Sequence, residues 1–178
     1  MRWYPSDPRW HGAQRHYFNF AAVHSLILII YVVLVIVEGV LMRRWTSDWG
    51  YGSRASTPYD FWARHGPYLL LDAALSLVSA WFIHRSKWHP VAALVTSVLA
   101  VCLWLCACLL NALLAYYSEY SFAERGEWEK IAYAQAAMQG LLVVCYAGMV
   151  GCAGKAVGVW KAERRVRRAE ERVGGLVM

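Results

Sequence analysis

Four long apolar stretches separated by short polar segments dominate the hydrophobic pattern of this 178-residue chain. They run from Phe18 to Met42, from Pro67 to Ile83, from Pro90 to Tyr116 and from Ile131 to Val159. Each reaches or approaches the roughly 20 residues that a helix needs to cross a bilayer, where a helix alone satisfies its own backbone. The pattern therefore predicts an all-α bundle of four transmembrane helices, formed by residues 1–160 and followed by a tail, 161–178.

The second stretch is the shortest of the four. Pro67 suits the first turn of a helix or a bend, and the helix gains a turn if it begins near Phe61. The third stretch starts at Pro90, directly after a short polar turn, so the second and third helices are expected to form a tight antiparallel hairpin.

The distribution of Lys and Arg predicts the orientation. With four spans, the N-terminus, the 84–89 turn and the C-terminal tail share one side, which carries twelve of these residues against six on the other. By the positive-inside rule both termini are cytoplasmic, although Arg43 and Arg44 argue locally for the reverse. Of ten tryptophans only Trp104 lies mid-span, and the others are expected in the headgroup regions.

Composition excludes other classes of protein. The chain is 59% hydrophobic with a formal charge of +6, but its basic residues flank apolar spans, so binding to nucleic acid is not expected. All five cysteines lie in the third and fourth spans, without Cys-x-x-Cys or metal-ligand spacing, and are interpreted as small hydrophobes. We therefore expect no cofactor, no metal and no catalytic residues.

The fourth span carries small residues, including Cys152, at multiples of four from Ala132 to Cys152 and a further pair four apart at Gly154 and Gly158, and such residues let two helices approach closely. The stripe seats this helix in its own bundle or forms a contact between copies of the chain, and both alternatives stay open. Its members are Ala132, Ala136, Gly140, Gly148, Gly154 and Gly158.

The tail is basic and is expected to continue the fourth helix until Gly174 and Gly175 end it. Its charges either enforce orientation or bind anionic lipid on the cytoplasmic side, since each contributes about 1 kcal/mol near an anionic leaflet. The lipid contacts would be Lys161, Arg164, Arg165, Arg167, Arg168 and Arg172.

Polar residues within the spans form the main candidate site. Counted from the predicted span ends, Glu38, Asp72, Asn111 and Gln135 share a depth, so Asn111 and Gln135 are expected to hydrogen-bond to Glu38 or Asp72. Alternatively the layer only fixes helix register, with Glu38 reaching water or pairing with Arg43 or Arg44. The intramembrane His24 is expected to make an interhelical hydrogen bond rather than to bind haem.

Two short segments suggest a family. The third span opens with His-Pro-Val-Ala-Ala-Leu, at 89–94, and the fourth is entered through Trp128-Glu129-Lys130. With four spans and cytoplasmic ends, the region from Phe18 to about Lys161 resembles the MARVEL-type membrane proteins of filamentous fungi. The resemblance implies a non-enzymatic protein of lipid microdomains, membrane apposition or vesicle traffic, with no catalytic residues to transfer.

The first functional expectation is thus a multi-pass protein of the plasma membrane or endomembranes that organises lipids, microdomains or partner proteins, including copies of itself. The alternative is a small proton- or ion-linked transporter that uses Glu38 and Asp72. A membrane enzyme ranks third, because no catalytic motif is found. A pocket open to one face, lined by ionisable groups, would favour an enzyme, whereas a scaffold predicts a sealed bundle.

The orientation can be tested by glycosylation. An Asn-x-Thr acceptor introduced near Ser53 should be glycosylated in a secretory host, because this loop is predicted to be lumenal or extracellular. An unmodified acceptor, together with a C-terminal tag protected from cytosolic protease, would show the opposite orientation.

Overall fold

The computed structural model of the chain describes residues 8–10, 12–47, 58–85, 88–117 and 125–174. Over these ranges the chain is helical, without strands: a short 3-10 helix η1 precedes four long α-helices. The elements are η1 (Pro8–Trp10), α1 (Gln14–Ser47), α2 (Pro58–His84), α3 (Pro90–Tyr117) and α4 (Arg125–Gly174). All four α-helices are long and apolar enough to cross a membrane, which supports the prediction of a multi-pass membrane protein.

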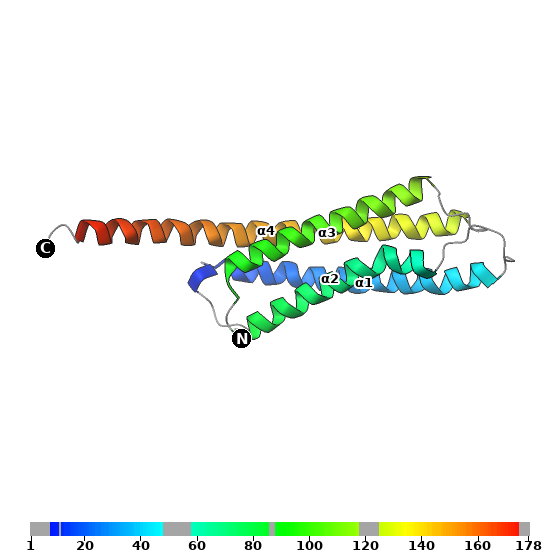
Figure 1. The fold of residues 1–178 in the computed structure, drawn as a ribbon, viewed down its shortest axis with the longest axis horizontal. Coiled ribbons are helices and arrows are strands. Elements are labelled where there is room, and N and C mark those ends of the chain that lie inside the picture. The colour runs from blue at the N-terminus through cyan, green and yellow to red at the C-terminus, as the bar shows by residue number, and fades with distance from the viewer. Residues whose placement is uncertain (1–7, 11, 48–57, 86–87, 118–124, 175–178) are drawn as a thin grey trace.

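Each helix runs antiparallel to the one before it in the chain, so α1 and α3 point one way along the bundle and α2 and α4 the other (Figure 1). One end, here called the tail end, holds η1, the end of α2, the start of α3 and the projecting part of α4. The opposite end, here called the loop end, holds the end of α1, the start of α2, the end of α3 and the start of α4. As predicted, α4 continues without interruption through Trp160 into the tail and ends at Gly174.

Packing is uneven around the bundle. α4 lies closely against α3 and α1, whereas α2 makes few close backbone contacts, most of them with α3. The described residues of α2 that are buried are Phe61, Arg64, His65 and Asp72, and no described residue beyond Asp72 is buried. Figure 1 shows the same feature as a divergence of α2 from α1 toward the tail end.

The buried positions recur every seven residues, the spacing that keeps one face of a helix toward its neighbours in left-handed packing. On α3 the contact face is small, with Ala93, Ala100 and Ala107 almost fully buried. On α1 the buried stripe is Tyr17, His24, Tyr31 and Glu38. The outward positions are mostly Leu, Val and Ile, so the bundle is apolar outside and partly polar inside, as expected in lipid.

α2 begins at Pro58, nine residues before the apolar stretch that starts at Pro67. Pro67 lies inside the helix and cannot donate to the carbonyl of Ala63, but it does not end the helix. Arg64 and His65 lie before the apolar stretch but inside the helix, as the alternative start near Phe61 predicted, and both are buried.

Three of the tryptophans that were expected in the headgroup regions are covered by the protein itself. Trp10, Trp88 and Trp128 lie near helix ends but are buried, since each indole packs against other helices or finds a partner inside the protein. The indole Nε1 of Trp10, for example, donates to the carbonyl oxygen of Trp88 at 3.1 Å.

The small-residue stripe of α4 packs within the chain over most of its length. Ala132 and Ala136 are buried, and a Cβ at Gly140 would contact Cys108 of α3 at 3.9 Å. A Cβ at Gly148 would instead lie 2.6 Å from the ring of Phe20 on α1, and one at Gly154 would contact Leu94 of α3. Residues four apart are rotated by about 40° relative to each other around the helix axis, so successive members of the stripe turn from one neighbouring helix to another. Gly158 is exposed and has open space in front of it.

Candidate functional site

The Glu38 carboxylate is the centre of a buried cluster at the loop end. Its Oε1 accepts hydrogen bonds from Arg64 of α2 and, at 3.1 Å, from Trp128 Nε1 of α4. Its Oε2 accepts from His65 Nε2 at 3.0 Å and from Gln135 Nε2 at 2.7 Å. Four donors from two helices thus fill the acceptor positions of one carboxylate that is 1% exposed.

A directional chain of hydrogen bonds leads into this cluster. Asn111 Nδ2 donates to Gln139 Oε1 at 3.0 Å, and Gln139 Nε2 donates to the Tyr31 hydroxyl at 2.9 Å. Tyr31 then donates to His65 Nδ1 at 2.8 Å, which leaves the Nε2 proton of His65 for Glu38. The chain joins all four helices and gives each of its members one orientation.

Asp72 is the centre of a second cluster, nearer the tail end. Its Oδ1 accepts from Trp104 Nε1 of α3 at 3.0 Å and from the Tyr146 hydroxyl of α4 at 2.5 Å. His24 Nε2 of α1 lies 3.4 Å from the same oxygen, and its ring packs on Tyr146 with centroids 4.6 Å apart. His24 thus faces Asp72 on another helix, as expected, but its Nε2 does not reach hydrogen-bond geometry with any described residue.

The four residues predicted to form one polar layer are all buried but are divided between the two clusters. The expected bond from Gln135 to Glu38 is present, whereas Asn111 bonds to Gln139. Asp72 does not share the depth of Glu38: it faces His24, which lies fourteen residues, about 21 Å, back along α1. The error arose because the depth of Asp72 was counted from Pro67 rather than from the true start of α2.

One alternative held that the Glu38 side chain reaches water, but the carboxylate is buried. Arg64 supplies the cation at 7% exposure, and its guanidinium lies 5.7 Å from the Trp128 ring centroid. The side chains of Arg43 and Arg44 lie outside the described part of the structure. The ring of Trp104 lies between the two clusters, because its Nε1 bonds to Asp72 while the ring makes a T-shaped contact with the Tyr31 ring, with centroids 5.3 Å apart.

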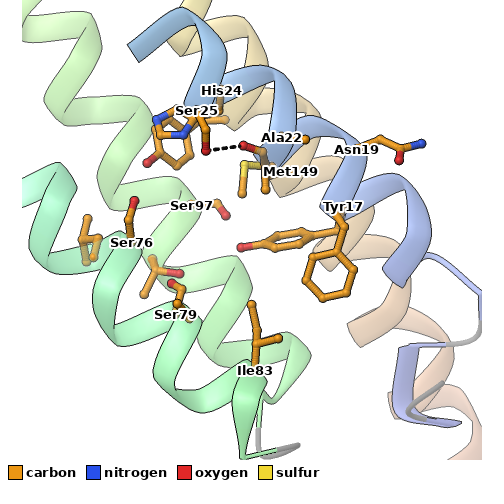
Figure 2. Close-up of a pocket in the computed structure, with 16 residues that line it drawn as sticks. Tyr17, Asn19, Ala22, His24, Ser25, Ser76, Ser79, Ile83, Ser97 and Met149 are labelled. Carbon is orange, nitrogen blue, oxygen red and sulfur yellow. Dashed lines mark hydrogen bonds between the residues drawn. The ribbon is translucent and has the colours of Figure 1, made fainter. Parts of the chain in front are cut away.

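Next to the Asp72 cluster, a cavity of about 700 Å³ lies between α1 and α2. Tyr17, His24, Ser97, Tyr146 and Met149 form its buried base. Its rim is exposed and comes from both helices, with Ala22 and Ser25 on α1 and Ser76 and Ala80 on α2. We call this cavity the lateral pocket, since it opens where α2 diverges from α1 (Figure 2).

Hydroxyl groups supply most of the polarity of the lateral pocket. Ser25 Oγ and Thr96 Oγ1 donate to carbonyl oxygens of their own helices, at 3.0 and 2.9 Å. Ser97 is 1% exposed, and its Oγ makes no hydrogen bond of regular geometry among the described residues. Figure 2 shows Ser97 and the ring of Tyr17 directed into the space between α1 and α2.

The tail and the cysteines complete the candidate residues. Residues 161–171 of α4 are all exposed, and Arg164 stacks on Trp160 at 4.0 Å. The side chain of Arg172 lies outside the described residues. Cys102 and Cys106 are exposed on the bundle surface, and no group of side chains in the described ranges could hold a metal ion.

No protein-family model, no curated protein and no solved structure matches this chain. The MARVEL resemblance thus stays a prediction, and function has to be argued from the geometry of the site.

The Glu38 cluster predicts a specific pattern of stability changes. Glu38→Gln should lower the free energy of unfolding in detergent by about 3 to 5 kcal/mol, because it leaves the Arg64 cation buried without an anion. Glu38→Gln combined with Arg64→Met should recover most of this loss. Glu171→Gln, the same change at an exposed position, should have little effect, and a double variant as unstable as Glu38→Gln would contradict the assignment.

Proposed function

We propose that the protein is a non-enzymatic, multi-pass membrane protein that binds a membrane lipid in the lateral pocket and so organises lipids around itself. The observation that carries this proposal is the sideways opening of the pocket between two spans. A ligand that enters between α1 and α2 comes from the bilayer. The volume of the lateral pocket, about 700 Å³, lies within the roughly 300–1,000 Å³ typical of small-molecule sites.

The surroundings of the pocket favour a lipid over a water-soluble molecule. Leu26 on α1 and Leu77 on α2, next to the rim, are 61% and 72% exposed and would face acyl chains. A simple scaffold was expected to form a sealed bundle, but this bundle has a pocket that opens between α1 and α2. The open pocket with His24 at its base also meets one expectation for an enzyme, but it contains no nucleophile paired with a base among the described residues.

The tail adds a second, electrostatic contact with lipid in this proposal, with the tail end on the cytoplasmic side. Arg164 and Arg165 lie within about 8 Å of Trp160 along the helix, within the screening length at physiological salt, whereas Arg168 lies about 12 Å away. The nearer pair has no acidic residue three or four positions away. Arg167, by contrast, is four residues from both Glu163 and Glu171. We therefore assign the anionic-lipid contact to Lys161, Arg164 and Arg165.

The pocket can be tested by filling it. Ala80→Phe, at the rim, should abolish the retention of a lipid by the purified protein in native mass spectrometry, because the new ring occupies the opening. Ala74→Phe adds the same ring at an exposed position of α2 outside the pocket and should retain the lipid. Equal retention by both variants would contradict binding in the lateral pocket.

The tail can be tested with two variants that remove the same charge. Energy transfer from the protein to a labelled phosphatidylserine in vesicles reports lipid enrichment. Arg164→Gln with Arg165→Gln should weaken this association about 30-fold at physiological salt, since each charge contributes about 1 kcal/mol. Arg167→Gln with Arg168→Gln should change it much less. Equal effects of the two variants would show that distance from the membrane does not select the contacts.

Proton-linked transport is a second candidate, favoured by the contact between Asp72 and His24 at the base of an open pocket. It requires a proton to pass from one cluster to the other, yet the Trp104 ring lies between them. Purified protein in liposomes should therefore carry no proton flux. A flux that disappears in Asp72→Asn would replace lipid binding as the preferred function.

A further inference from the structure

The chemistry of the lateral pocket restricts the head group that it can hold. The described residues that line it include His24 but no Lys or Arg. Proteins bind phosphate groups through Arg or Lys, or through backbone N–H groups at a helix N-terminus. The pocket contacts the C-terminal part of α2, from Leu75 to Ile83, where no helix N-terminus is present. Tyr17 lies in the first turn of α1, but its N–H donates to the Ala13 carbonyl at 3.1 Å, and the lining residues of α3 and α4 lie beyond the first turn, where N–H groups are used within the helix. A phosphate would therefore be buried here without compensation.

The Asp72 carboxylate makes an anionic head group still less favourable. His24 lines the pocket, and its Nε2 lies 3.4 Å from Asp72 Oδ1, so a negative charge stands directly behind the base. In the low-dielectric interior of a bundle, the carboxylate repels a second anion placed on the other side of the His24 ring more strongly than it would in water. A neutral head group avoids both this repulsion and the loss of hydration of a buried charge.

The base of the pocket does offer hydrogen bonds to a neutral group. Ser97 Oγ is buried and makes no hydrogen bond of regular geometry among the described residues, although the Tyr17 hydroxyl lies close enough to interact with it. The serine therefore keeps capacity to donate to and accept from a head group, with the Tyr17 hydroxyl beside it. A hydroxyl group has the same two capacities and can satisfy the serine with one bond. Such a bond would remove the cost of a buried hydroxyl that has no regular hydrogen bond.

The remaining lining suits an apolar body attached to that head group. Phe18 of α1, Leu75 and Ile83 of α2, and Met149 of α4 supply apolar surface around the hydroxyl groups. With Ser97 at the base and the opening between α1 and α2, the head group would lie inside and the apolar body would extend toward the bilayer (Figure 2).

We infer that the lateral pocket binds an uncharged lipid whose head group is a hydroxyl, such as a diacylglycerol or a sterol, and holds this hydroxyl at Ser97. The inference rests on the proposed function, since it names the class of lipid that enters the pocket. The lateral pocket would thus select a different class of lipid from the tail, where the charges of Arg164 and Arg165 attract anionic lipids outside the bundle.

Photoactivatable diacylglycerol and phosphatidic acid with identical acyl chains provide the test, because they differ only in the head group. With full-length protein in nanodiscs, the diacylglycerol probe should label peptides of the lateral pocket at least tenfold more than the phosphatidic acid probe. Ser97→Ala should reduce this labelling about fivefold, as expected for one lost hydrogen bond of about 1 kcal/mol. Cys102→Ala makes a comparably small truncation at an exposed position of the same helix, α3, outside the pocket and should leave labelling unchanged.

The outcomes separate the inference from the proposed function. Stronger or equal labelling by phosphatidic acid would overturn the head-group class while lipid binding stands. Full labelling of Ser97→Ala would overturn the position of the hydroxyl. If a sterol probe labels the pocket and diacylglycerol does not, the inference that the ligand is an uncharged lipid with a hydroxyl head group stands, and the lipid is a sterol. If neither of the matched probes nor the sterol labels the pocket, both the inference and the proposed function fail.

Discussion

The neutralisation of Glu38 is the constraint on which the arrangement of the four helices depends. A carboxylate buried within a membrane bundle is costly unless cations and hydrogen-bond donors surround it. Here α2 supplies Arg64 and His65, and α4 supplies Trp128 and Gln135. These donors fix the depth and rotation of α2 and α4 relative to α1, and the chain from Asn111 through Gln139 extends the same constraint to α3.

The same constraint explains why the bundle is closed at one end and open at the other. α2 is held at the loop end through Arg64 and His65 and near its middle through Asp72. Beyond Asp72 no described residue of α2 is buried, so nothing comparable draws it against α1. The lateral pocket lies in this half. Its base is formed by the same stripe of α1, where Tyr17 and His24 precede Tyr31 and Glu38 at intervals of seven.

The sequence predicted the number and approximate limits of the helices, because hydropathy measures the length of apolar surface. It left the start of α2 open, because Arg64 and His65 are not apolar and are buried only where Glu38, 26 positions before Arg64, accepts from them. The depth of Asp72 was wrong for the same reason. A usable signal was present in the spacing of Tyr17, His24, Tyr31 and Glu38, polar-capable residues seven apart in a largely apolar helix, with Trp10 seven residues before them in η1.

The lateral pocket could not have been predicted from composition, because its residues come from four helices and only their divergence creates the space. A single serine such as Ser76 or Ser97 is common within an apolar span, so neither residue by itself indicates a pocket. Likewise the small residues of α4 indicated close packing without indicating which helix each would meet, since a repeat of four drifts around the helix.

A structure of the protein determined in lipid nanodiscs that contain diacylglycerol and phosphatidic acid would test the central claim most directly. The account predicts density for one lipid between α1 and α2, with an uncharged head group within hydrogen-bond distance of Ser97 and its chains directed into the bilayer. Close packing of the tail-end halves of α1 and α2, with no lipid between them, would contradict it.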